Sequence, residues 1–443
     1  MSQHTSESPR TQTLAPKRTH SATLDEEVQS LVFPSGLTVL FCPKPGFKKK
    51  YACYSTFYGS VDSEFLEPSG SRLKVPDGIA HFLEHSLFET EEGNVSDLFA
   101  KKGTYNNAST SFTTTTYLFA STSRFFENLE LLLGFVENPV FRPEKVEKEK
   151  GIIEQEIRGY EDNPGWVSYM GLLENLFEKH PMRIDIAGTA ETIGKIDSET
   201  LHRCFQAFYS PSNMILFVVG DVDPAELFGF VAEKSRFASA PPRVTRGVER
   251  IYPEEPRAVF RPETRKEMEV ALPKLLLGFK EVGVPDRGDD FVLQDLATEL
   301  ALEILFGKSS NTFRDLYESQ MVLDDFGAFY SIGAGVGYGV VGGDTPKPDE
   351  LKDLLLGKLS SLIEKGIDAE AFERGKRRFM GSFIRSFNSL EYIASHYTYF
   401  RFHDFDLFRS IDLLARIDRE TLEERVRTLL DPANHASFVV LPK

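Results

Sequence analysis

The sequence predicts an α+β fold of two similar tandem domains, each a mostly antiparallel sheet with helices packed on one face. Three observations predict it. The chain has 443 residues, which is more than one ordinary domain requires. Residues 238–256 contain four prolines and no apolar period, as is typical of a linker. Strand and helix patterns follow in the same order on either side of this linker, which indicates a repeated unit.

The predicted boundaries follow from this division. Residues 1–24 are polar, rich in serine and threonine, and lack the apolar segment of a secretory signal, so we expect a flexible tail there. Residues 25–237 are predicted to form the first domain, 238–256 the linker and 257–443 the second domain.

The first half opens with strand patterns. A proline–glycine turn at 34–36 separates two β-branched and aromatic runs, which predicts a hairpin. Residues 51–59 alternate like a third strand, and a helix is expected to begin near Asp77. Residues 106–122 are rich in threonine and aromatic residues, which favours one long strand. Two helices and a buried closing strand complete the half, with expected ranges 124–137, 143–162 and 213–224.

The second half repeats this order. Its predicted elements are a strand, a helix, a strand, two helices and a closing strand, over 275–281, 289–307, 338–344, 349–366, 368–385 and 436–443.

The two helices with the clearest correspondence keep their apolar positions in phase. Val146 aligns with Phe372, and Ile153 aligns with Phe379. This favours two copies of one domain. Shared patterning by coincidence is the alternative at this point.

Composition excludes several classes of protein. Hydrophobic residues make up 41% and charged residues 27% of the chain, which excludes general disorder. No apolar run approaches the roughly 20 residues needed to cross a bilayer, so we expect no membrane span. A net charge of −16 disfavours nucleic acid as a partner. Three scattered cysteines exclude a disulfide framework, and we expect a reducing, cytoplasmic location.

A histidine pair begins the candidate site. His81 and His85 are four residues apart on a predicted helix, so both imidazoles point the same way and can bind one ion. Glu84 lies on the same flank and can reach a water beside that ion. This is the H-x-x-E-H order of the inverzincins. Two helical histidines can also be ordinary surface or core residues, which is the alternative.

A catalytic zinc requires a third protein ligand and one open position. Glu149 and Glu156 are seven residues apart on the following helical pattern, so they share one face. Glu154 points to another face. An exposed, charged helix face with Glu–Lys pairing would explain the same spacing.

These stretches, together with 103–119 and the closing 218–224, resemble the insulinase/pitrilysin family of zinc peptidases, and most closely its mitochondrial-processing-peptidase-like bacterial branch. The resemblance implies that each chain forms half of a clamshell around a chamber. It implies His81, His85 and Glu156 as ligands of one Zn²⁺ per chain, Glu84 as general base and Glu149 as the acid that supports a ligand. The aligned second half has Ser382 in place of Glu156, so no second zinc is expected.

The resemblance also implies a substrate-binding edge strand. A peptide would add to it as a further strand, held mainly by backbone hydrogen bonds. Plain β-propensity is the competing explanation for the threonine run. The implied positions are Asn107, Ala108, Ser109, Thr110 and Ser111.

One expected feature is missing. Active family members carry an arginine and a tyrosine seven residues apart that bind the scissile carbonyl, and the corresponding positions here are Tyr317 and Asp324. Arg314 lies close by but has Met321 seven residues on. The resemblance therefore implies a heterodimer in which a sibling subunit supplies this pair, with a homodimer as second choice.

The function expected from the sequence is a zinc-dependent endopeptidase that hydrolyses peptides or unfolded segments as the metal-bearing subunit. The alternative is a family member that captures peptides or serves as a scaffold without cleaving them.

Overall fold

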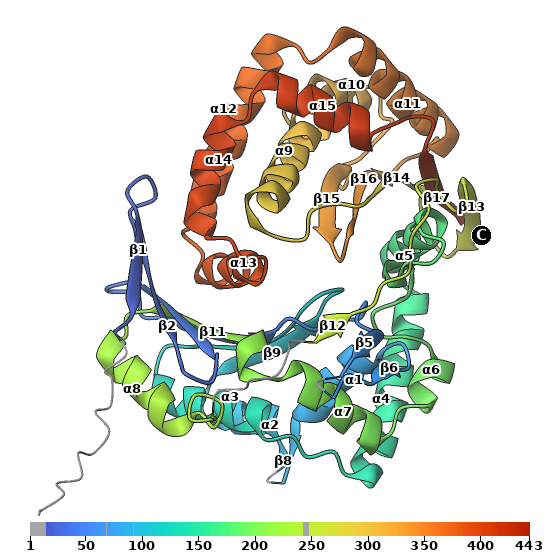
Figure 1. Ribbon diagram of the computed structural model, residues 1–443. Coiled ribbons are helices and arrows are strands. Elements are labelled where there is room, and N and C mark those ends of the chain that lie inside the picture. The colour runs from blue at the N-terminus through green and yellow to red at the C-terminus, as the bar shows by residue number, and fades with distance from the viewer. Residues whose placement is uncertain (1–14, 68, 92, 242–247) are drawn as a thin grey trace, which may run out of the picture.

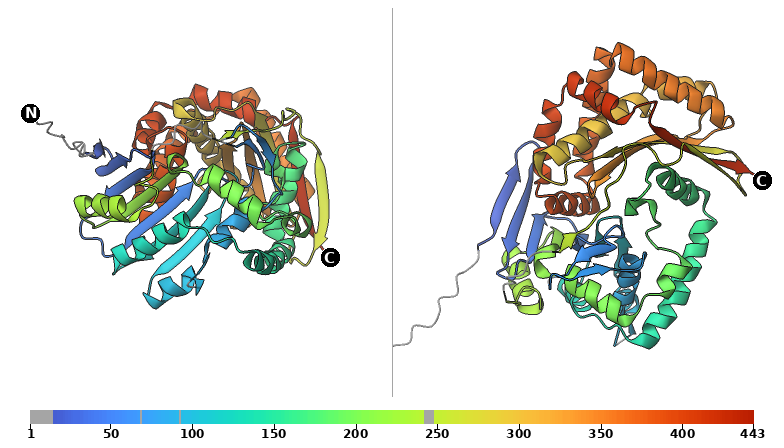
Figure 2. Two further views of the ribbon diagram at one scale, coloured as in Figure 1. Left: turned by 60° about the horizontal axis from the view of Figure 1, so that its bottom comes forward. Right: turned by 45° about the vertical axis from the view of Figure 1, so that its right-hand side comes forward.

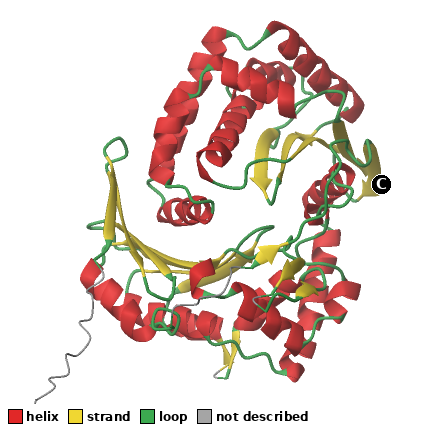
Figure 3. Cartoon of the chain, in the orientation of Figure 1, coloured by secondary structure: helices red, strands yellow, loops and turns green. Residues whose placement is uncertain are grey.

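The computed structural model describes residues 15–67, 69–91, 93–241 and 248–443, and it confirms the predicted α+β fold of two domains (Figure 1). The first domain lies at the bottom of Figure 1 and the second at the top. Each consists of a sheet and a layer of helices (Figure 3). Within the described ranges, none of the helices has both the length and the hydrophobicity that crossing a bilayer requires.

The first sheet has seven strands, of which only the β3–β11 pair is parallel. Strand β9 forms one edge, and β1 and β2 extend the other (Figure 2). The central strands β3, β11 and β4 are mostly buried because helices cover one face and the second domain approaches the other. In spatial order the strands are β1 (Lys17–Ser21), β2 (Glu26–Val32), β3 (Thr38–Pro43), β11 (Met214–Gly220), β4 (Lys50–Thr56), β10 (Thr115–Ser121) and β9 (Tyr105–Thr110).

The second sheet reproduces the last five strands of the first in order and direction. Its parallel pair, β13–β17, matches β3–β11, and three antiparallel pairs follow in both sheets. This agreement in topology supports a true repeat over coincidental patterning. The strands are β13 (Glu263–Met268), β17 (His435–Pro442), β14 (Lys274–Val282), β16 (Val336–Asp344) and β15 (Gly327–Gly333).

Helices fill the remaining layers. In the first half they are α1 (Ile79–Leu87), α2 (Val95–Lys101), α3 (Phe125–Glu137), α4 (Pro143–Glu161), α5 (Pro164–Leu176), α6 (Ala190–Gly194), α7 (Ser198–Phe208) and α8 (Pro224–Lys234). In the second half they are α9 (Gly288–Phe306), α10 (Asn311–Glu318), α11 (Pro348–Lys365), α12 (Ala369–Ser386), α13 (Leu390–Phe402), α14 (Ser410–Arg416) and α15 (Arg419–Leu429). Short strands β5 (Glu64–Leu66), β6 (Arg72–Lys74) and β12 (Glu249–Arg250) form a separate sheet, and β7 (Glu89–Thr90) pairs with β8 (Gly93–Asn94).

Each domain contributes one helix that packs on the sheet of the other domain. Helix α5 packs on β14 and β17 of the second sheet, where a Cβ on Gly171 would lie 2.1 Å from the ring of Phe438. Helix α13 packs on β4 and β11 of the first sheet. The rings of Phe217 and Tyr397 meet there with 5.4 Å between their centroids, a spacing typical of aromatic pairs. The two helices follow the equivalent helices α4 and α12. The domains are therefore joined by reciprocal packing in addition to the linker.

Two predictions about extended segments are wrong in part. The expected flexible tail over 1–24 includes β1, which pairs along its whole length with β2; residues 1–14 lie outside the described residues. The single strand expected over 106–122 is a hairpin of β9 and β10. Its turn has no glycine or proline, and the hydroxyl of Ser111 instead accepts hydrogen bonds from the backbone N–H groups of Thr113 and Thr114.

The linker is packed into the structure where it is described; residues 242–247 are outside that part. Strand β12 pairs with β5, which extends the first domain beyond the predicted boundary at 237. Further on, Glu255 accepts hydrogen bonds from three consecutive backbone N–H groups at 178–180 and from Lys280 Nζ at 2.8 Å. This carboxylate fixes the linker between the end of α5 and β14.

We expect Lys280→Met to lower the free energy of unfolding by about 3–5 kcal/mol, because it leaves a buried carboxylate without its cation. The side chains of Lys280 and Glu255 are 0% and 2% exposed. Lys358→Met is the control, since its pair with Asp315 is exposed and should contribute less than about 1 kcal/mol. Urea unfolding checks both; equal losses would contradict a structural role for the buried pair.

A cavity of about 650 Å³ lies between the first sheet and the second domain. Two carboxyl groups of α9 line it. Burial raises the pKa of Asp295 to about 8, and the charge of Glu299 adds to the effect. Burial also raises the pKa of Glu299 to about 7, against the hydrogen bond that it accepts from the N–H of Tyr330.

The raised pKa values of Asp295 and Glu299 lower the free energy of unfolding as the pH rises. A carboxyl with a higher pKa in the folded chain binds more protons when folded, so stability is lost from about pH 4 up to the folded pKa. We expect Asp295→Asn to be more stable than the unchanged protein at pH 8.5 by ~1 kcal/mol or more, and the gain to shrink at pH 5. Urea unfolding at the two pH values checks this. A gain that does not depend on pH would refute the titration.

Candidate metal centre

The start of α1 is fixed by two close backbone contacts. Gly78 has a φ of +88°, and a Cβ there would lie 2.4 Å from the carbonyl oxygen of Ala187. Gly188 has a φ of +74°, and its Cβ would lie 2.5 Å from the carbonyl oxygen of Asp77. Both positions therefore require glycine. The apolar residues of α1 are buried in the core of the first domain, so the helix presents its polar residues in one fixed direction.

The structure brings together the three residues that were predicted to bind metal. His81 Nε2 lies 3.8 Å from Glu156 Oε1, and His85 Nε2 lies 3.4 Å from Glu156 Oε2. All three offer a ligand atom within 4.8 Å of the others. Two imidazoles and one carboxylate are the donors of a three-ligand catalytic zinc site, and ligand atoms ~2.0–2.2 Å from a tetrahedral ion lie little closer together than these. The residues present therefore fit zinc.

The structure also gives different surroundings to Glu149, Glu154 and Glu156 of α4. Glu149 is buried, and its Oε1 lies 2.9 Å from His85 Nδ1, which holds this imidazole with Nε2 toward Glu156. Glu154 instead forms an exposed ion pair with Arg158. His81 Nδ1 is buried and has no hydrogen-bond partner among the described residues. Among the described residues, the Nδ1 atom of His85 therefore has a hydrogen-bond partner, whereas that of His81 has none.

Glu84 lies beside the histidines and is 7% exposed. Its Oε2 accepts a hydrogen bond of 2.7 Å from the hydroxyl of Thr110, which belongs to β9. Burial raises the pKa of Glu84, against this hydrogen bond and the nearby His85. A carboxyl with a raised pKa is suited to accept and return a proton near neutral pH.

The titration of the three metal-binding candidates reflects their mutual contacts. Burial lowers the pKa of His81 to about 4, and the charge of His85 adds to this effect. Burial also opposes the charging of His85, but hydrogen bonds with Glu149 and Glu156 outweigh it and raise the pKa of His85 to about 10. The hydrogen bond with His85 lowers the pKa of Glu156 to about 2, against its burial. Glu156 is thus ionised, as metal ligation requires, whereas His85 has to release a proton when a metal binds.

Strand β9 is an edge strand with one unpaired side. It pairs only with β10 among the described residues, through Asn107, Ala108, Ser109 and Thr110. Ser111, the fifth predicted substrate residue, lies in the turn that follows, where its hydroxyl holds the turn together. Four of the five predicted positions therefore lie on a strand that can accept another strand.

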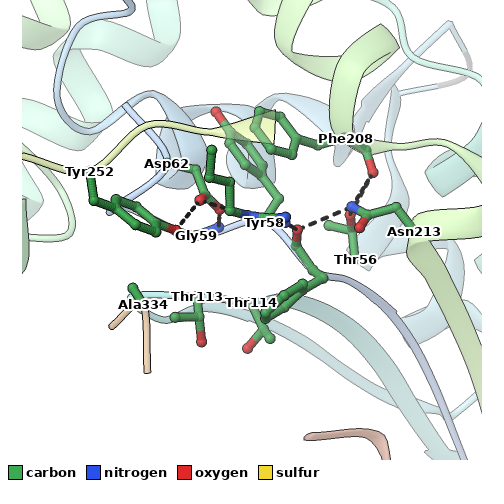
Figure 4. Close-up of polar contacts among 12 residues, drawn as sticks. Thr56, Tyr58, Gly59, Asp62, Thr113, Thr114, Phe208, Asn213, Tyr252 and Ala334 are labelled. Atoms are coloured by element: carbon green, nitrogen blue, oxygen red, sulfur yellow. Dashed lines mark hydrogen bonds and ion pairs between the residues drawn. The ribbon is translucent and has the colours of Figure 1, made fainter. Parts of the chain in front are cut away.

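The tip of this hairpin is anchored to the loop at 57–62 (Figure 4). The N–H groups of Ser60 and Val61 donate to the carbonyl oxygens of Ser111 and Phe112, both at 3.1 Å. A Cβ on Gly59 would lie 2.3 Å from the oxygen of Phe112, so only glycine allows this approach.

A buried carboxylate orders the anchoring loop in turn. Asp62 accepts hydrogen bonds from the N–H of Gly59 at 3.0 Å and from the hydroxyl of Tyr252 at 2.9 Å (Figure 4). It also accepts one from Arg250 Nε at 2.9 Å. The linker residues Arg250 and Tyr252 thus help to hold the edge strand beside Glu84. This contact could not be predicted from sequence patterns, because it joins residues 190 positions apart.

Among the residues that the structure describes, the second domain holds no equivalent centre. His81, His85 and Glu156 are the one group of possible metal ligands found in the described ranges. Tyr317, at the position of the missing arginine, is 47% exposed on α10, where its ring stacks on Phe313.

Comparisons with known proteins agree with this geometry. Residues 68–190 match the family model of insulinase (peptidase family M16), and residues 195–379 match that of the M16 peptidase inactive domain. The chain is 41% identical over 427 residues to YmfH of Bacillus subtilis (strain 168), an uncharacterised zinc protease, with 95% of this chain and 98% of that protein covered. The chain belongs to the M16 peptidase family.

Other M16 relatives cover most of the chain. YmxG of Bacillus subtilis (strain 168), a further uncharacterised zinc protease, is 26% identical over 340 residues and covers 72% of this chain and 78% of its own. A crystal structure from Alicyclobacillus acidocaldarius, described as M16-like, superposes with a TM-score of 0.89 at 34% identity, and covers 97% of this chain and 99% of its own. The M16 fold thus accounts for both domains.

Proposed function

We propose that this M16 family member is a zinc-dependent endopeptidase that cleaves peptides or unfolded protein segments. The observation that carries the proposal is the convergence of His81, His85 and Glu156 next to Glu84 and the open edge of β9. A candidate metal site, a buried base and a strand-binding edge are three of the parts that peptide hydrolysis at zinc uses.

The edge of β9 accounts for the choice of substrate. An extended peptide that adds to this edge is held by backbone hydrogen bonds, which any sequence can make. A folded protein has no free strand to add, so flexible peptides and unfolded segments are the expected substrates. Because Thr110 of β9 donates to Glu84, a peptide added to the strand lies beside the base.

Glu84 is the expected proton carrier. A zinc ion held by the three ligands would lower the pKa of a bound water towards neutrality and polarise the scissile carbonyl. Glu84 accepts a proton from the attacking water and returns it to the leaving amine. Its burial and the hydrogen bond from Thr110 hold the carboxylate in place for both transfers.

The chain itself offers little to bind the developing oxyanion. Tyr317 and Asp324 replace the arginine and tyrosine that the family uses, and an aspartate repels an oxyanion. We therefore propose that a sibling M16 subunit with an arginine and a tyrosine seven residues apart completes the site in a heterodimer. A homodimer is the second possibility.

Reconstitution with such a sibling should raise peptide cleavage by about 10²–10³-fold, the usual contribution of oxyanion donors. The measurement is hydrolysis of a quenched fluorescent peptide by the isolated chain, with and without the sibling, and with and without a chelator. A sibling whose arginine and tyrosine are both replaced serves as control. Full activity of the isolated chain would overturn the heterodimer.

A second candidate function is the capture of peptides without cleavage. The replacement of the arginine–tyrosine pair by Tyr317 and Asp324 favours it. In that case zinc and peptide would both bind, and no cleavage would occur with any sibling.

A further inference from the structure

A line of side chains leads away from the third candidate ligand. The hydroxyl of Tyr160 donates a hydrogen bond of 2.5 Å to Glu156 Oε1. The ring of Tyr160 stacks on Trp166, with 5.0 Å between the centroids and 28° between the planes. Trp166 Nε1 in turn donates to Asp185 Oδ2 at 2.6 Å. Glu156 is therefore connected to Asp185 through two aromatic side chains.

Asp185 connects this series of contacts to α1, the helix that carries His81 and His85. Asp185 Oδ1 accepts a hydrogen bond from the N–H of Ala187 at 2.9 Å, which orders the loop at 185–188. The same loop meets the start of α1, where Gly78 and Gly188 permit the close backbone approach. The contacts thus form a ring that joins α4, which bears Glu156, to α1, which bears His81 and His85.

Local sequence explains why the aromatic rings meet. Tyr160 lies four residues after Glu156, on the same face of α4. Asn163 then caps α5 by accepting from the N–H of Trp166 at 3.1 Å, and Pro164 occupies the first turn. This break between the helices turns Trp166 back onto Tyr160.

A glutamate without such a contact would have to lose side-chain freedom on binding a metal, at a cost of up to about 2 kcal/mol. The side chain of Glu156 is 30% exposed, so packing alone does not fix it.

We propose that Tyr160, held by Trp166 and Asp185, is a positioning residue that presets the Glu156 carboxylate for the metal and thereby sets metal affinity. The inference rests on the proposed metal centre. It assigns a role to Trp166, the one tryptophan of the chain, whose fluorescence becomes a reporter of the site.

The test uses the full chain with zinc alone as ligand. Tyr160→Phe keeps the stacked ring and removes the hydroxyl, and it should weaken zinc binding by about 10–100-fold in competition with a chelator, as loss of an outer partner of a ligand usually does. Tyr399→Phe is the matched control, because it removes a hydrogen bond of 3.0 Å to the oxygen of Ile332 in the second domain and should leave zinc affinity unchanged.

A second variant keeps the proposal falsifiable if Tyr160→Phe fails to fold. Asp185→Asn keeps an oxygen for Trp166 but weakens that hydrogen bond, and it should lower zinc affinity to a smaller extent. Zinc should change Trp166 fluorescence in the unchanged protein and less in Tyr160→Phe. Unaltered zinc affinity in a folded variant of either kind would overturn the positioning role. Failure of the unchanged protein to bind zinc would overturn the metal centre itself.

Discussion

Glu84→Gln is expected to reduce peptide cleavage by about 10²–10⁴-fold, the usual contribution of a general base, while zinc content stays at one ion per chain. Glutamine has nearly the same shape but cannot accept the proton of the attacking water. The amide can still accept the hydrogen bond from Thr110, so the site should keep its geometry. The measurement is cleavage of a fluorogenic peptide by the chain with its sibling, together with metal analysis of the same sample.

Glu91→Gln provides the control for this experiment. Glu91 forms an exposed ion pair with Arg142, and its amide should leave both cleavage and zinc content unchanged. Retained turnover in Glu84→Gln would contradict the assignment of Glu84 as base. Loss of zinc from Glu84→Gln would show that Glu84 supports the metal.

The second large effect is expected at the third ligand. Glu156→Gln should weaken zinc binding by more than the ~10–100-fold that follows loss of an outer partner, because it removes a charged donor from the site. Glu149→Gln should fall within that range, since Glu149 acts through His85. Glu154→Gln should have no effect, because its carboxylate pairs with Arg158 away from the centre.

Competition with a chelator measures all three variants in one assay. The expected order of zinc affinity is Glu154→Gln above Glu149→Gln above Glu156→Gln. If Glu154→Gln weakened binding as much as Glu156→Gln, the assignment of the third ligand along α4 would be wrong.

Much of the fold could be predicted because its signals are local. The helical phase of Val146 and Ile153 indicated α4, and both side chains are buried in that helix. The repeat could be predicted because the same order of strands and helices recurs in both halves of the chain. The exchange of α5 and α13 between the domains was not predicted, because a helical pattern shows which face is apolar but not which sheet covers it.

The two predictions about extended segments that were wrong in part have separate causes. The turn between β9 and β10 rests on the hydroxyl of Ser111 and carries no glycine or proline, so the run of threonines resembled one strand. Strand β1 is short and polar, and only its pairing with β2 shows that it belongs to the sheet.

In the site, too, local spacing could be predicted from the sequence and tertiary contacts could not. His81, Glu84 and His85 could be found from spacing because they lie within one turn and a half of a helix. Tyr160 was within reach of the same reasoning, since it lies four residues after Glu156, but its role depends on Trp166 and Asp185 across a helix break. The anchoring of β9 by Asp62 and Arg250 depends on tertiary contacts alone.

The central claim is that one divalent ion is held by two imidazoles of α1 and one carboxylate of α4. Anomalous diffraction at the zinc absorption edge, from crystals of the chain grown with zinc, tests this most directly. We expect one strong peak per chain within bonding distance of His81 Nε2, His85 Nε2 and a carboxylate oxygen of Glu156. A peak at other residues, or none at these three at full zinc loading, would contradict it.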